Sequence, residues 1–163
     1  MENPIDINKL FENALKDPRL LSDIDVDKML ESLENERNDY LENKTIESVT
    51  KEIYDRVNEL SIMPDLKKHY CKQLSEYRLV NDIHELHKGK HVKWIRIANE
   101  RLIGGGIVMN IKFTDNGTHV LVKNPLNKFI QIKWDDCWIF QKMTMEEQLI
   151  LMAYGYLETK LPS

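Results

Sequence analysis

Two β-rich runs joined by an Asn-Gly turn decide the fold of this chain: residues 105–124, GGIVMNIKFTDNGTHVLVKN. β-Branched residues are frequent in both runs, and they favour the pleated, half-buried surface of a strand. Asn116-Gly117 between two apolar runs is a strong signal for a tight hairpin turn. We therefore predict an antiparallel hairpin in which Val120 and Val122 point toward the interior.

Three further β-rich runs flank this hairpin. They are KHVKWIRI at 90–97, KFIQIKW at 128–134 and CWIFQK at 137–142, separated by short turn-like stretches. Five short strands in meander order, with a last strand that follows a single turn, are typical of small barrels. The predicted fold class is therefore α+β: an N-terminal helical region, a small five-stranded SH3/Tudor-like β-barrel and a C-terminal helix.

The first half of the chain has the period of amphipathic helices. Apolar residues recur every three or four positions in four segments, 6–16, 26–41, 45–60 and 64–77. The most regular apolar stripe, in the third segment, consists of Ile46, Val49, Ile53, Val57 and Leu60. Such a stripe suits a helical hairpin, a packed bundle or the seam of a dimer.

A last helix is predicted over residues 144–158. Thr144 and Glu147 have the spacing of a capping box, in which each side chain accepts a hydrogen bond from the other residue's backbone N–H. The chain is thus expected to divide into an acidic helical region over 1–80 and a basic barrel with its capped helix over 81–163.

The net charge of −4 hides two regions of opposite sign. Residues 1–87 carry twelve basic and twenty acidic side chains, whereas residues 88–142 carry ten basic and four acidic ones. The acidic helices can cover the basic strands within one chain, or they can pair with the strands of another subunit. The sequence leaves both arrangements open.

Composition narrows the class of protein. The N-terminus has no basic segment followed by an apolar run, and no apolar run approaches the roughly 20 residues of a membrane span. Cys71 and Cys137 lie far apart, and we expect both to be reduced thiols. These features predict a protein of the cytoplasm or nucleus that has no membrane contact.

His84, His87 and His91 invite a metal-site interpretation. Their spacing would align them on one helix face, but Gly89 interrupts the segment and is a typical helix stop. We therefore expect a short helical turn that ends near His87, a strand that begins at Lys90, and neither metal nor cofactor.

Catalytic patterns are absent from the sequence. The IGGGIV stretch at 103–108 precedes a strand and lacks the Gly-Lys-Ser/Thr of a phosphate loop, so it predicts a tight bend before that strand. Cys137 follows Asp135 and Asp136, whose charges would raise the thiol pKa and weaken it as a nucleophile. The chain is not expected to be an enzyme.

The basic strands carry the best candidate surface. Alternation in the first hairpin strand places Ile107, Met109, Ile111 and Phe113 inside, with Lys112 outside. An outward Phe129 between lysines is a combination that binds single strands, because bases stack on rings and ammonium groups neutralise phosphates. The candidate binding residues are Lys93, Arg96, Arg101, Lys112, Lys123, Lys128, Phe129 and Lys133.

The C-terminal half resembles a class of uncharacterised small proteins encoded by giant DNA viruses. The resemblance is carried by DIHELHKGKHVKWIR, GGIVMNIKF, NGTHVLVKN, FIQIKWDDC and EEQLILMAY, and it does not include the N-terminal helices. It implies a viral setting, in the host cell or the virion, and it carries over no catalytic residue.

The sequence therefore predicts a non-catalytic interaction or structural module. A protein partner, bound through the barrel and the helical faces, is the first expectation, and nucleic acid on the basic barrel face is the alternative. A homo-oligomer through the helical region and a metal-dependent enzyme at the histidines are further alternatives. An aromatic cage for methylated lysine is not expected, because Trp94, Trp134, Trp138 and Phe140 are assigned to the core.

Overall fold

A computed structural model describes residues 36–160, and the side chains of residues 38–156 within them. The described chain forms two compact units. The sheet unit consists of residues 50–143, and the terminal unit consists of residues 36–49 and 144–160. The sheet unit thus begins well before the boundary at residue 80 that the sequence suggested. No helix within the described residues has the length and apolar content needed to cross a membrane.

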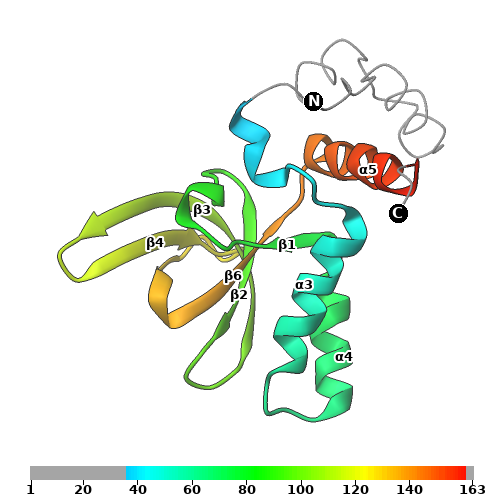
Figure 1. The fold of residues 1–163 in the computed structure, drawn as a ribbon. Helices are drawn as coiled ribbons and strands as arrows, with labels where there is room; N and C mark the ends of the chain where they lie inside the picture. Colours follow the sequence, from blue (N-terminus) through cyan, green and yellow to red (C-terminus); the bar gives the residue numbers. More distant parts are fainter. Residues whose placement is uncertain (1–35, 161–163) are drawn as a thin grey trace. The chain divides into compact units, whose positions relative to one another are not determined.

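The sheet unit is built on one six-stranded antiparallel sheet, in the order β1-β6-β2-β3-β4-β5 (Figure 1). In chain order its strands are β1 (Tyr77–Leu79), β2 (His91–Arg96), β3 (Leu102–Thr114), β4 (Gly117–Lys123), β5 (Phe129–Lys133) and β6 (Cys137–Lys142). Two 3-10 helices interrupt the connections, η2 (Ile83–Glu85) before β2 and η3 (Trp134–Asp136) before β6.

The predicted five-stranded barrel is wrong. The five predicted strands are present as β2 to β6, but a sixth strand, β1, pairs with β6, and the sheet stays open with β1 and β5 at its edges. The helical period concealed β1, because the buried Tyr77 continues the apolar spacing of the preceding helix. That helix, α4 (Pro64–Gln73), ends earlier, and Glu76 turns the chain with a φ of 69°.

The glycines of IGGGIV lie within β3 and not in a bend before it, which corrects the sequence interpretation. They fall where β3 passes from pairing with β2 to pairing with β4. Gly105 has a φ of 81°, and a Cβ there would lie 2.9 Å from Nε2 of His91. At Gly106 a Cβ would collide with Cγ1 of Val122, so the two strands approach more closely than any side chain allows.

A β-bulge between Val108 and Asn110 explains why the predicted facing of β3 was partly wrong. Before the bulge the interior residue is Val108, and Ile107 is exposed. The extra residue, Met109, shifts the alternation by one, so Ile111 then packs against the core. Phe113, predicted to point inside, is 72% exposed near the hairpin turn.

We expect Gly106→Ala to destabilise the protein by about 1–3 kcal/mol, the usual cost of overpacking a tight contact. The added methyl group would meet Val122 and would approach the carbonyl oxygen of Lys123 to 2.9 Å, so β3 and β4 would have to separate. Urea unfolding measures the change. Gly104→Ala is the matched control, because its Cβ would meet no atom within 4 Å. Equal stabilities of the two variants would contradict the prediction.

One face of the sheet, here called the inner face, encloses its own core. Its buried strand residues are Val92, Trp94, Val108, Val120, Val122, Ile132 and Ile139, and Val80 and Leu86 from the connections join them. The strand residues come from five strands, which shows that the sheet bends over this face. The inward orientation predicted for Val120 and Val122 is confirmed, and Trp134 packs against the same core as expected.

The opposite, outer face is covered by helices over β1, β6 and β2. The helices are α3 (Ile46–Asn58) and α4, which lie side by side in Figure 1. The core between the helices and these strands consists of Ile53, Val57, Leu60, Tyr70, Leu74, Tyr77, Leu79, Ile95 and Phe140. The last three residues of the predicted apolar stripe, Ile53, Val57 and Leu60, therefore pack against the sheet within the chain.

The terminal unit contains η1 (Glu36–Leu41) and α5 (Met145–Lys160). The predicted capping box is confirmed: the backbone N–H of Glu147 donates to Oγ1 of Thr144 at 3.0 Å, and the N–H of Thr144 donates to Oε1 of Glu147 at 3.0 Å. Tyr40 in η1 donates to the other carboxylate oxygen of Glu147 at 2.7 Å. The predicted helix over 6–16 and most of that over 26–41 lie outside the described residues.

Candidate nucleic-acid interface

The six strands contain basic side chains and not one carboxylate. Their sequences are YRL, HVKWIR, LIGGGIVMNIKFT, GTHVLVK, FIQIK and CWIFQK. The Lys and Arg residues among them are Arg78, Lys93, Arg96, Lys112, Lys123, Lys133 and Lys142. The acidic residues of the sheet unit lie in its helices and connections, so the strands themselves contribute only positive charges.

Three strands present such an open face. Directly paired residues of antiparallel strands point to the same side, so the register defines rows across β3, β4 and β5. The rows on the outer face are Ile107–Lys123–Phe129, Asn110–Leu121–Gln131 and Lys112–His119–Lys133. We call these nine residues the basic face. Each of its strands contributes one lysine, and each row contains at least one residue that can bind a polar ligand.

Phe129 stands out on the basic face because it is 60% exposed. It belongs to the edge strand β5, opposite Lys123. Leu121 is half-buried in the middle of the face, and Lys112 is exposed at its far row. The helices α3 and α4 pack on the other strands of the sheet, so the aromatic ring and the ammonium groups are presented together to solvent.

The structure brings together five of the predicted binding residues. Lys112, Lys123, Phe129 and Lys133 lie on the basic face, and the exposed Lys128 immediately precedes β5. The outward orientation predicted for Phe129 and for Lys112 is confirmed.

The other three predicted residues lie elsewhere. Lys93 is on the outer face of β2, where its Nζ donates to the carbonyl oxygen of Gln73 at 3.0 Å. Arg96 is at the end of β2 and pairs with Cys137, on the inner side of the sheet. Arg101 is exposed just before β3 and accepts a backbone hydrogen bond from Arg96.

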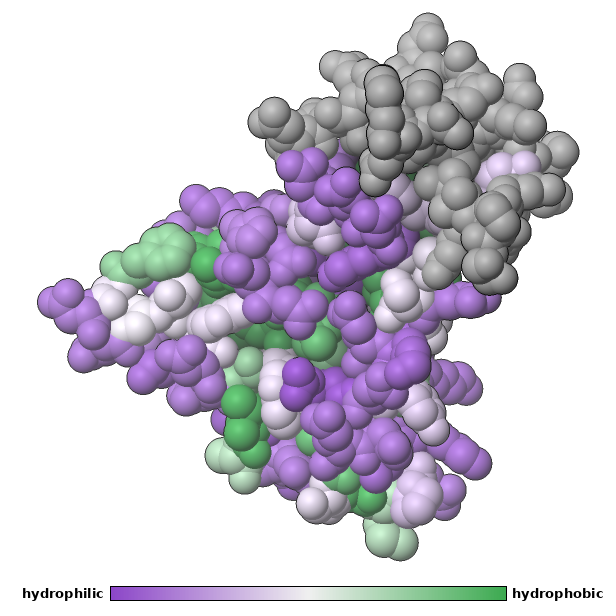
Figure 2. All heavy atoms as spheres, viewed as in Figure 1, coloured by the Kyte–Doolittle hydropathy of each residue, from purple (hydrophilic) through white to green (hydrophobic). Residues whose placement is uncertain are grey.

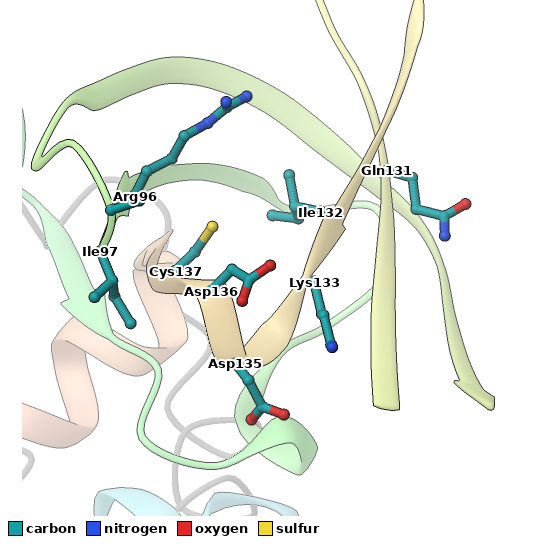
Figure 3. A pocket seen from close by; sticks show the side chains of 9 residues that line it. Arg96, Ile97, Gln131, Ile132, Lys133, Asp135, Asp136 and Cys137 are labelled. Atoms are coloured by element: carbon teal, nitrogen blue, oxygen red, sulfur yellow. The ribbon is translucent and has the colours of Figure 1, made fainter. Parts of the chain in front are cut away.

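A cleft of about 530 Å³ lies beside Arg96, between the end of β2 and the segment from β5 to η3. Figure 3 shows Asp136 and Cys137 between Arg96 and Ile132, whereas the Gln131 side chain lies on the far side of its strand. The lining contains both signs of charge. The cleft therefore differs in charge from the basic face, although Gln131 and Lys133 belong to both.

The cleft has no activated nucleophile. Burial raises the pKa of the Cys137 thiol, Arg96 partly offsets that rise, and Asp136 adds to it. The predicted direction of this shift is confirmed, although burial and not the aspartates is its largest cause. The thiol of Cys137 is thus protonated at neutral pH and is a weak nucleophile.

The three histidines do not meet. His84 Nδ1 lies 3.1 Å from a carboxylate oxygen of Asp82, and His91 Nδ1 lies 2.8 Å from the hydroxyl group of Tyr77. His87 lies in the loop after η2. This 3-10 helix ends at Glu85, and Gly89 in the loop has a φ of 82°. The described part of the chain contains no group of three or more His, Cys, Asp or Glu residues placed to hold a metal ion.

Sequence reasoning missed several residues of the basic face, among them Asn110, His119 and Gln131. No local pattern marks them, because they become neighbours of the lysines only through the register of three strands. The alternation in β4 and β5 gave their direction, but the bulge in β3 hid the row to which Asn110 belongs.

Comparison with known proteins gives no relative: no protein-family model, no curated protein and no solved structure matches this chain. The resemblance to proteins of giant DNA viruses stays a prediction.

Proposed function

We propose that this protein binds single-stranded nucleic acid on the basic face. The observation that carries the proposal is a sheet whose strands lack any carboxylate and whose open rows combine three lysines with an exposed phenylalanine. Polyanion binding requires a surface where phosphates meet cations without competing carboxylates.

The geometry suits an unpaired strand. Neighbouring β-strands are about 4.8 Å apart and successive residues about 3.4 Å apart along a strand, so Lys112 and Lys133 lie about 10 Å apart in one row and Lys123 lies roughly 14 Å from either. Phe129 offers a ring on which a base can stack, and stacking requires a base that is free of a duplex. Asn110 and Gln131 add amide groups that hydrogen-bond to bases, sugars or phosphates. Binding of this kind depends weakly on sequence and strongly on salt.

A protein partner is the second candidate function. The far end of the β3–β4 hairpin exposes Phe113, and Met109 is 43% exposed in the bulge. Figure 2 shows hydrophobic side chains on the surface along this hairpin, between hydrophilic ones. Exposed apolar residues that gather on one element mark contacts with proteins. If this candidate is correct, the protein partner contacts the exposed apolar residues Phe113 and Met109 and does not require the lysines of the basic face.

Phe129→Ala tests the first candidate. We expect it to weaken binding of labelled oligothymidylate or oligouridylate by roughly 5- to 150-fold, which corresponds to the stacking of one base at about 1–3 kcal/mol. Fluorescence anisotropy at low salt measures the dissociation constant.

The matched control for this experiment is Phe113→Ala, which removes another exposed phenylalanine ring, from the hairpin end. It should bind the oligonucleotide like the wild-type protein. Absence of binding by the wild-type protein at low salt, or equal affinities of the Phe129→Ala and wild-type proteins, would refute the proposal.

A further inference from the structure

One row of residues crosses all six strands on the outer face. Tyr77 pairs with Lys142, and the β6–β2 register places His91 opposite Lys142, one position beyond the Val92–Gln141 pair. His91 pairs with Ile107, Ile107 with Lys123, and Lys123 with Phe129. The basic face therefore continues, along this one row, into a second group of cations on β2 and β6.

This second group is built closely around Tyr77. The tyrosine hydroxyl group lies 2.8 Å from Nδ1 of His91, and Nζ of Lys93 lies 5.0 Å from the centre of the tyrosine ring. Lys142, directly opposite Tyr77, is exposed. Gly105 keeps room for the imidazole, since a Cβ there would approach the His91 ring to 2.9 Å. Three groups that can carry positive charge thus lie side by side at the end of the row.

Lys93 and Lys142 repel each other, and both disfavour the protonated form of His91. Burial lowers the pKa of His91, and the charges of Lys93 and Lys142 lower it further. Burial and then Lys142 likewise lower the pKa of Lys93. The charge of Glu76 acts on Tyr77. Among the described residues, neither Lys93 nor Lys142 forms an ion pair with a carboxylate. An anion placed here would relieve the repulsion.

We propose that Lys142, Lys93 and His91 bind a backbone phosphate of the same nucleic-acid strand that the basic face binds, an inference that rests on the proposed function. Phosphate is the matching group because it accepts several charge-assisted hydrogen bonds at once. Lys142 is exposed, and the Lys93 ammonium group keeps one N–H donor beyond the two that it gives to the carbonyl oxygen and to Oε1 of Gln73. The bound strand then runs across the sheet from β5 toward β6, roughly perpendicular to the β-strands.

This path sets a minimum length for the ligand. From β5 to β6 the sheet order has four intervals of about 4.8 Å, so Phe129 and Lys142 are separated by about 19 Å along the row. A thymidine dinucleotide, with its single internucleotide phosphate, is too short to place a base on Phe129 and also a phosphate at Lys142, whereas an oligothymidylate of about twelve nucleotides is long enough.

Lys142→Ala tests the inference with these two oligonucleotides. With the long one, we expect the slope of log K against log salt concentration to become shallower by about 0.7, the value for one phosphate contact to a single strand. With the short one, the Lys142→Ala and wild-type proteins should bind equally. The matched control is Lys68→Ala, which removes an exposed lysine from α4 and should change neither slope.

The outcomes separate the two proposals. If Lys142→Ala equals the control on the long oligonucleotide while Phe129→Ala still weakens binding, this inference is wrong and the proposed function stands. If the wild-type protein binds neither oligonucleotide at low salt, both are wrong.

NMR titration of the His91 imidazole identifies the source of the phosphate. Bound long oligonucleotide should raise the pKa of His91, because a nearby anion favours the protonated ring. Inorganic phosphate at the same phosphate concentration should leave this pKa unchanged. An equal rise with inorganic phosphate would overturn the inference in favour of a site for free anions.

Discussion

Simultaneous replacement of Lys112, Lys123 and Lys133 by alanine is expected to weaken oligonucleotide binding on the order of a hundredfold or more at low salt. Each lysine that contacts a phosphate of a single strand contributes about 0.7 to the slope of log K against log salt concentration. The triple variant should therefore have a slope shallower by about 2. The loss should be similar for different base sequences, because phosphate contacts carry no sequence information.

A matched triple variant separates this local effect from a change in net charge. Lys51, Lys68 and Lys72 are exposed on α3 and α4, and their replacement by alanine changes the net charge equally. This control should keep the wild-type slope. If both triple variants lose binding alike, the protein attracts polyanions only through its overall charge, and the basic face is not the site. Urea unfolding of both variants checks that they are folded.

Phe140→Ala is expected to lower the free energy of unfolding by about 3–5 kcal/mol, the usual cost of deleting a fully buried aromatic side chain. Phe140 has 0% exposure and lies between the sheet and the helices that cover it. It pairs with Leu79 on one side and with Lys93 on the other, so the cavity would open at the centre of the outer face. A loss of this size is a large share of the roughly 5–15 kcal/mol that stabilises a typical domain.

Phe113→Ala is the control for this experiment as well. Its ring is 72% exposed, and its removal should change stability by no more than about 0.5 kcal/mol. A cost below about 1 kcal/mol for Phe140→Ala, measured by urea unfolding, would show that the helices are not held to the sheet by the core described above.

Signals of short range were enough to predict most of the sheet. Asn116-Gly117 and the alternating residues around it predicted the β3–β4 hairpin, and Thr144 with Glu147 predicted the start of α5. These predictions succeed because turn chemistry and capping depend on residues that are close in sequence.

The failed predictions depend on contacts that are distant in sequence. β1 is a strand of three residues that exists because β6 lies beside it, and its buried Tyr77 satisfies a helical pattern equally well. The barrel was predicted from the number and order of strands, which do not reveal whether the edges pair. The bulge at Met109 has no sequence signature, so one alternation was applied to two halves of β3 that differ in phase.

The candidate site was predicted only in part, because some of its residues become neighbours through contacts that are distant in sequence. Phe129 and Lys133 could be placed outside from the alternation of β5 alone. Their grouping with Lys112 and Lys123 required the register across three strands, and the role proposed for Lys142 required the row across all six. Arg96 has the same kind of charge, yet it points to the other side of the sheet.

The division of β3 between two ladders also has a consequence for cooperativity. Its first half hydrogen-bonds to β2, beside the helix-covered strands, and its second half hydrogen-bonds to β4 within the basic face. The inner-face core joins the two halves, because Val92 and Trp94 of β2 pack in one cluster with Val120 and Val122 of β4. Hydrogen exchange should therefore find β2, β3 and β4 in one slowly opening unit, so that the binding surface and the helix-covered core melt together.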